Sequence, residues 1–208
     1  NDAWTSISWS SIDYYGNKKA FHYKLSEMYA PILLGLDDAG NDNYKLWICN
    51  DKQRDIDGRI RIVVEDMQGN QMFAFSEVVD VKANSCYRFP KDIAIKMTEK
   101  MKSDCYARII FMEDDTVLSE KIHIFKYPKD MNFIETQLEP KVTFVDGKYH
   151  LEFNSKVFVK DVFVSTTEAG EFSANYFDVL PNVTKTIIFE PEDKKKKDLK
   201  FNIHTYNN

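Results

Sequence analysis

The sequence predicts a mainly β protein, with two antiparallel β-sandwiches preceded by one amphipathic helix. Short alternations of apolar and polar residues, bounded by turn residues, recur from residue 32 almost to the end of the chain, a pattern typical of strands. No helical segment separates them, although parallel strands would require crossover helices. The composition agrees, because Phe and Tyr, which favour strands, number 15 and 11 while Gly numbers 7.

The helix is expected between Lys18 and Tyr29, where the residues are mostly good helix formers without Gly or Pro. Phe21, Leu25 and Met28 recur on one face. A helix of about three turns is marginal alone in water. Its apolar stripe is therefore expected to pack on the first sandwich or on another copy of the chain, which would give a homodimer through the exposed helix.

Residues 31–133 are expected to form the first sandwich. Residues 91–102 fit neither a helical nor a strand period and are predicted to be an irregular or strand-like connection. A proline followed by polar residues interrupts the alternation at 127–133 and marks the boundary. Strands are predicted at 32–36, 44–49, 59–64, 72–81, 87–89, 105–111 and 117–125.

Residues 134–208 are expected to form the second sandwich. Asp146-Gly147 stands between two alternating runs, which is a strong hairpin signal. About six or seven strands in this span match a minimal immunoglobulin-like sandwich. They are predicted around 142–144, 149–153, 157–164 (one strand or a pair), 172–179, 186–189 and 199–203.

Composition excludes several kinds of partner. The net charge of −5 argues against nucleic acid, whose binding surfaces are basic. No apolar run approaches a membrane span, and the chain is expected to open inside a domain, without a signal peptide. The histidines show no metal-ligand spacing, so no metal or cofactor is expected. They are His22, His123, His150 and His204.

Three cysteines, Cys49, Cys86 and Cys105, are too few and too scattered for a disulfide framework. Buried free thiols are the expected state. An inter-sheet bridge between Cys49 and Cys105 is the alternative.

Residues 1–4, 8–16, 19–23 and 30–31 resemble the end of the catalytic barrel in glycoside hydrolase family 2 β-mannosidases. In that family this segment follows the last barrel strand and forms the closing helix. One departure is Lys18, which stands where the family usually has a tryptophan. The resemblance implies that residues 1–30 are the tail of a (β/α)8 barrel.

The resemblance continues through both sandwiches, and covers essentially the whole chain. Residues 119–120 and 128–130 are similar to the end of the family's first post-barrel sandwich, and residues 157–162 and 172–181 to its C-terminal immunoglobulin-like domain. The most specific run is Asn175-Tyr176-Phe177-Asp178-Val179-Leu180-Pro181. Asn182-Val183 departs from the Gly-Glu that commonly follows.

The resemblance implies a non-catalytic C-terminal accessory region of a retaining β-mannosidase, periplasmic or secreted. The full-length enzyme would hydrolyse terminal β-D-mannose residues of β-mannosides or mannooligosaccharides, which the barrel binds, while this chain packs against the barrel. Both catalytic glutamates lie on earlier barrel strands, so this chain is assigned no catalytic, binding or metal residue. The pairs Asp37-Asp38 and Asp114-Asp115 are interpreted as solvated turn residues rather than a catalytic dyad.

The alternative is a stand-alone carbohydrate-binding or protein-interaction module. Trp4, Trp9 and Trp47 are its candidate sugar-stacking residues, although Trp47 is expected to pack on a sheet. The lysine-rich stretch 190–198 is interpreted as a solvated hairpin tip rather than a grip for an anionic partner, and Asn182-Val183-Thr184 as a weak glycosylation sequon. Barrel-like strands with glutamates encoded upstream would favour the accessory region.

Overall fold

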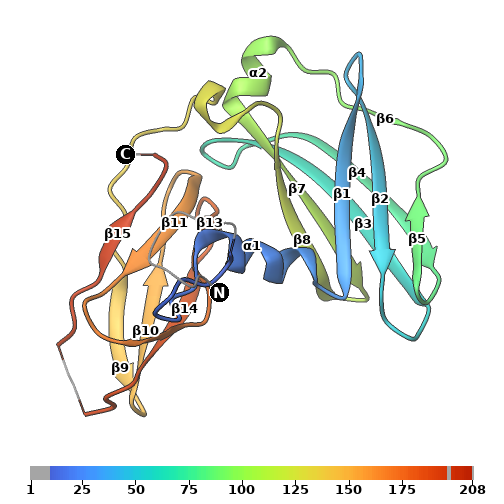
Figure 1. Cartoon of the computed structure of the whole chain (residues 1–208). Coiled ribbons are helices and arrows are strands. Elements are labelled where there is room, and N and C mark those ends of the chain that lie inside the picture. Colours follow the sequence, from blue (N-terminus) through green and yellow to red (C-terminus); the bar gives the residue numbers. More distant parts are fainter. Residues whose placement is uncertain (1–9, 196–197, 208) are drawn as a thin grey trace. The chain divides into compact units, whose positions relative to one another are not determined.

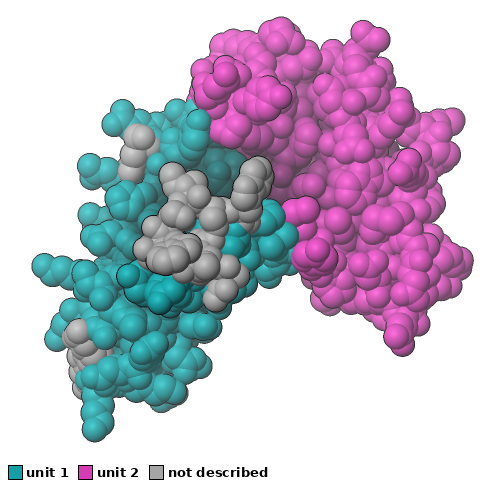
Figure 2. Space-filling view, viewed as in Figure 1, with its two compact units in different colours: residues 1–27, 133–208 teal, residues 28–132 magenta. Residues whose placement is uncertain are grey.

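The computed structural model describes residues 10–195 and 198–207. It divides into two compact units, coloured separately in Figure 2. Residues 28–132, magenta in Figure 2, form the unit called here the first sandwich. The other unit, teal, joins the chain up to Glu27 with the part from Phe133 onward, and the latter part is called the second sandwich. The predicted fold class is confirmed: both sandwiches are antiparallel, and one helix precedes them.

Two sheets enclose the core of the first sandwich (Figure 1). One has the order β1-β2-β5, with β6 also paired to β2, and the other has the order β4-β3-β7-β8. The strands are β1 (Ile32–Gly40), β2 (Asn43–Asn50), β3 (Ile56–Asp66), β4 (Gln71–Val81), β5 (Ser85–Arg88), β6 (Ile93–Ala94), β7 (Cys105–Glu113) and β8 (Thr116–Ile124).

Strict alternation explains why these segments are strands. In β3, Ile60 and Ile62 are fully buried while Arg59 and Arg61 are exposed, as period-two side chains require. Each aliphatic side chain buried in this way contributes roughly 1.5–3 kcal/mol.

The prediction for residues 91–102 is wrong in part. A short strand, β6, is followed by one helical segment, α2 (Glu99–Asp104). Thr98 caps this helix, because its hydroxyl accepts a hydrogen bond from the Met101 amide at 3.2 Å. A Thr before Glu and Lys is an N-terminal helix signal, but six residues are too few to show a helical period.

The second sandwich pairs a sheet of order β12-β14-β10-β9 with one of order β13-β11-β15. The predicted hairpin is confirmed: Val145 pairs with Lys148, and Asp146 and Gly147 both have positive φ, as a tight hairpin turn requires. Its strands are β9 (Lys141–Val145), β10 (Lys148–Phe153), β11 (Val159–Ser165), β12 (Gly170–Phe172), β13 (Phe177–Val179), β14 (Lys185–Pro191) and β15 (Asn202–His204).

The single strand predicted at 172–179 is divided into β12 and β13. Between them the buried Asn175 side chain bonds the backbone of Val164 twice, accepting from its N–H and donating to its carbonyl, each at 2.8 Å. Tyr176 then takes a positive φ of 54°. The Asn175 side chain therefore takes the place of a neighbouring strand in bonding the Val164 backbone. The alternation of apolar residues in the sequence does not reveal such a contact.

Candidate functional site

Helix α1 (Ala20–Met28) contacts the second sandwich through residues outside the predicted apolar stripe. The Tyr23 ring lies 6.0 Å from that of Tyr176, and Lys24 Nζ lies 3.9 Å from Asp161 Oδ1. Burial, with Tyr176 and Glu171 nearby, raises the pKa of Tyr23. The side of α1 that carries Tyr23 and Lys24 is thus the docked one.

The motif Asn175-Tyr176-Phe177-Asp178 builds the surface that receives α1. Asp178 Oδ1 accepts from Lys160 Nζ and from the Asp161 amide, both at 3.0 Å. Burial by itself lowers the pKa of Lys160, but Asp178 and Asp161 outweigh it and the pKa is raised. The ion pairs hold Asp161 where Lys24 reaches it, which gives the motif a structural role.

A neighbouring face of α1 carries exposed apolar side chains. Phe21 and Met28 are 52% and 60% exposed, and Tyr29, just after the helix, is 82% exposed. Leu25, the middle residue of the predicted stripe, is partly buried, and the expected packing on the first sandwich or on another copy stays a prediction. Tyr14 and Tyr15 are also exposed and lie at the tip of a turn that Asp13 closes by accepting from the Asn17 amide at 2.8 Å.

The acidic pairs lie in exposed positions. Asp38 accepts from the Gly40 amide at 2.7 Å, and Asp37 accepts from the Trp47 indole. Asp114 has a positive φ of 51° in the turn between β7 and β8. These contacts are those of turn and sheet-surface residues. Within the described residues, no three His, Cys, Asp or Glu side chains gather as a metal site, and no helix is long and apolar enough to cross a membrane.

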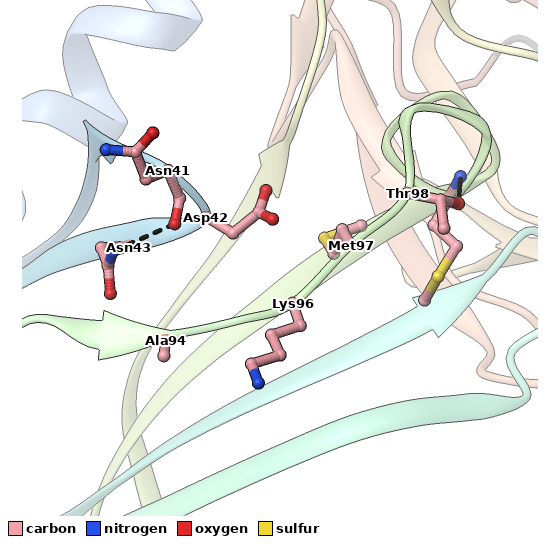
Figure 3. Close-up of a pocket in the computed structure, with 8 residues that line it drawn as sticks. Asn41, Asp42, Asn43, Ala94, Lys96, Met97 and Thr98 are labelled. Atoms are coloured by element: carbon pink, nitrogen blue, oxygen red, sulfur yellow. Dashed lines mark hydrogen bonds between the residues drawn. The ribbon is translucent and has the colours of Figure 1, made fainter.

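A pocket of about 460 Å³ opens at one end of the first sandwich (Figure 3). The β1–β2 turn faces the segment leading into α2 across it, and Asp42 Oδ1 pairs with Lys102 Nζ at 3.0 Å. No aromatic side chain lines this pocket, so it lacks a stacking surface. Its lining residues are Asn41, Asp42, Asn43, Ala94, Lys96, Met97, Thr98 and Met101.

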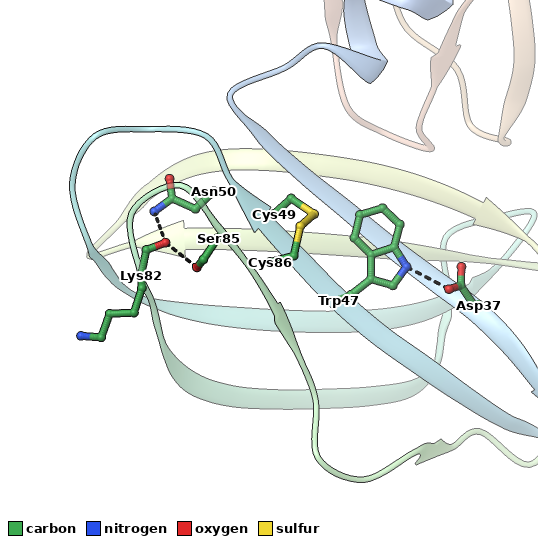
Figure 4. Close-up of a disulfide and its surroundings, with 7 residues drawn as sticks. All are labelled: Asp37, Trp47, Cys49, Asn50, Lys82, Ser85 and Cys86. Carbon is green, nitrogen blue, oxygen red and sulfur yellow. Dashed lines mark hydrogen bonds between the residues drawn. A yellow bond between two sulfur atoms is a disulfide. The ribbon is translucent and has the colours of Figure 1, made fainter.

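The outer face of the β1-β2-β5 sheet carries a flat indole (Figure 4). Trp47 on β2 lies opposite Gly35 on β1, and a Cβ added at Gly35 would come within 1.9 Å of the indole ring. The Trp47 Nε1–H donates to Asp37 Oδ2 at 3.0 Å. Trp47 thus packs on its sheet as predicted, yet it is only half-buried. Trp4, Trp9, Lys196 and Lys197 lie outside the described residues.

The prediction of three free thiols is wrong. Cys49 and Cys86, which face each other across β2 and β5, form a disulfide with an S–S distance of 2.06 Å. Cys105, the alternative partner for Cys49, is a buried free thiol whose pKa is raised by burial. Pairing between strands depends on register, which cysteine spacing alone does not supply.

Two family models match this chain. Residues 42–130 match a Mannosidase Ig/CBM-like domain, and residues 133–207 match the Ig-fold domain named Ig_mannosidase. Each match falls within one of the two sandwiches.

Three proteins of known sequence or structure are similar to this chain over most of its length. Beta-mannosidase B of Aspergillus niger is 21% identical over 205 residues, which cover 90% of this chain and 24% of that protein. The β-D-mannosidase of Dictyoglomus thermophilum has a TM-score of 0.81 at 18% identity, covering 99% of this chain and 25% of that one. An exo-chitosanase of Amycolatopsis orientalis has a TM-score of 0.68 at 12% identity, covering 98% and 29%. The chain spans about a quarter of the length of these relatives.

Proposed function

We propose that this chain, which carries the two mannosidase-type immunoglobulin-like domains, is the non-catalytic scaffold of a retaining β-mannosidase of glycoside hydrolase family 2. The full-length protein would hydrolyse terminal β-D-mannose residues of β-mannosides. Retaining hydrolysis requires two carboxylates about 5–5.5 Å apart beside the scissile bond. The acidic pairs Asp37-Asp38 and Asp114-Asp115 lie on exposed turns and a sheet surface, which supports the proposal that the catalytic pair belongs to a barrel outside this chain.

The exposed apolar side of α1 carries this proposal. One side of the helix docks on the second sandwich, while Phe21 and Met28 on the other are more than half exposed. Burying each such side chain stabilises a protein by roughly 1.5–3 kcal/mol, so this side suits a catalytic barrel. In the isolated chain it is also the surface through which a homodimer would form.

The test uses the full-length protein and this chain side by side. Phe21→Glu with Met28→Glu is expected to lower the melting temperature and the hydrolysis of an aryl β-mannoside in the full-length protein. Ser26→Glu, on an exposed position of the same helix, is the matched control and is expected to change neither. The isolated chain is expected to release no aglycone. Turnover by a barrel-free preparation, or full activity of the double variant, would contradict the scaffold role.

We also propose a periplasmic or secreted location for the full-length protein. The Cys49–Cys86 disulfide supports it, because such bonds persist in oxidising compartments. Alkylating thiols in intact cells before extraction, followed by peptide mass spectrometry, is expected to find Cys105 as a thiol and Cys49 joined to Cys86. Recovery of Cys49 and Cys86 as alkylated thiols would argue for a reducing compartment.

A further inference from the structure

We propose that the outer face of the β1-β2-β5 sheet is a binding site for a saccharide that carries uronate groups. The site, called here the indole platform, consists of Trp47 with Asp37, Lys45, Arg88 and Lys121 around it. It lies wholly within the first sandwich and rests on observations separate from those that support the scaffold role.

The indole is held flat and rigid. Only glycine fits at position 35, because the ring edge occupies the space of a Cβ there. The Trp47 Nε1–H is fixed by Asp37 Oδ2 at 3.0 Å. A ring already fixed in this way loses little conformational entropy when a ligand stacks on it. The part of the ring that stays exposed suits the C–H face of a pyranose.

Three basic residues lie near Trp47, and Asp37 pairs directly with one of them, Lys45, across β1 and β2. Arg88 pairs directly with Trp47 across β2 and β5, and directly paired residues have Cβ atoms roughly 5 Å apart. Lys45 lies two residues before Trp47 on the same face of β2. Lys121 Nζ, from β8, lies 5.8 Å from the ring centroid.

These cations are available to a ligand. No ion pair joins Lys45, Arg88 or Lys121 to a carboxylate in the described part of the chain, and Lys45, Arg88 and Lys121 are all exposed. Lys121 stands on a flexible four-carbon stem, so it can move to the ring edge as a sugar stacks. Basic residues that no described carboxylate pairs with, on a chain of net charge −5, favour an anionic ligand over a neutral one.

The disulfide holds the platform together. β5 has only four residues, and the Cys49–Cys86 bridge joins it to β2 two positions from Trp47 and Arg88. Arg88 is thereby kept beside the indole, which is the preorganisation that a specific site requires.

The probes are two tetrasaccharides that differ only at C6: β-(1→4)-linked mannuronate and β-(1→4)-linked mannose. Titrations of the folded chain, followed by calorimetry and by the NMR signal of the Trp47 indole N–H, measure binding. Trp47→Phe assigns that signal. We expect the uronate to bind on the order of tenfold more tightly than the neutral sugar, and its affinity to fall with added salt. Tetramers of galacturonate and glucuronate extend the test to other uronates.

Two double variants, each of which removes two positive charges, distinguish binding at the indole platform from a general effect of net charge. Lys45→Gln with Arg88→Gln is expected to weaken uronate binding on the order of tenfold. Lys156→Gln with Lys200→Gln, exposed lysines of the second sandwich, is expected to leave it unchanged. The proposal is overturned if none of the three uronates binds, if mannose and mannuronate bind equally, or if polyglutamate, an anion without pyranose rings, shifts the indole signal equally.

Discussion

In the first sandwich β3 and β4 are eleven residues long, whereas β12, β13 and β15 of the second sandwich have three residues each. The two hydrophobic cores also differ in composition. Ile, Leu and Val dominate the core of the first sandwich, while Phe and Tyr rings supply much of the second. Long ladders satisfy most backbone groups by themselves, but short ones leave N–H and C=O groups that need other partners.

Buried amide side chains supply those partners in the second sandwich. Asn207 donates to the Ile134 and Phe158 carbonyls and accepts from the Lys160 amide, each at 2.9 Å. Asn175 bonds Val164 in a similar way. The first sandwich has one such residue, Asn50. It also has a disulfide, which links the neighbouring strands β2 and β5. Similar folds are therefore stabilised by different means.

The largest expected effect concerns the covalent bridge. Cys49→Ala with Cys86→Ala is expected to destabilise the first sandwich by about 3–4 kcal/mol, the chain-entropy value for a separation of 37 residues. Urea unfolding followed by amide signals of each sandwich measures this. Cys105→Ala, which keeps the bridge, is the control. An equal loss in both sandwiches would show that they do not unfold as separate units.

A slightly smaller effect is expected for Asn207, whose buried side-chain amide bonds three backbone groups of the second sandwich. Asn207→Ala removes three hydrogen bonds and leaves their backbone partners buried, so a loss of about 3 kcal/mol is expected. Asn202→Ala, on an exposed position of β15, is expected to change stability by under about 0.5 kcal/mol. Equal losses in these two variants would contradict a special role for the buried amide. The same urea titration reports both.

The smallest expected effect is a pH dependence confined to the first sandwich. Burial, with Lys121 nearby, lowers the pKa of His123 to about 4. The unfolded chain then binds a proton more readily, so this stability is complete above about pH 6.5 and falls as pH drops toward 4, with a loss of roughly 2 kcal/mol at about pH 5. His123→Phe, which keeps ring contacts with Tyr44 and Phe125, is expected to flatten the profile. Identical profiles for both proteins would contradict the lowered pKa.

Strand positions could be predicted from the sequence because alternation in runs such as β3 has one physical meaning when one face is buried. The Asp146-Gly147 hairpin was equally predictable from its turn residues. Three features were not, because each depends on long-range pairing. They are the pairing of Cys49 with Cys86 across β2 and β5, the interruption of the strand predicted at 172–179 by Asn175, and the side of α1 that contacts the second sandwich. The indole platform was partly visible in Trp47 and Lys45 of β2, but its other two cations come from β5 and β8.

The docking of α1 has a consequence for biosynthesis. The helix precedes the first sandwich in the chain but docks on the second, so during translation it emerges from the ribosome well before Tyr176 and Asp161. Domains generally fold in order of synthesis, so the first sandwich can mature while Tyr23 of α1 still lacks its partner Tyr176. Nascent chains stalled before residue 133 are accordingly the ones most in need of a chaperone.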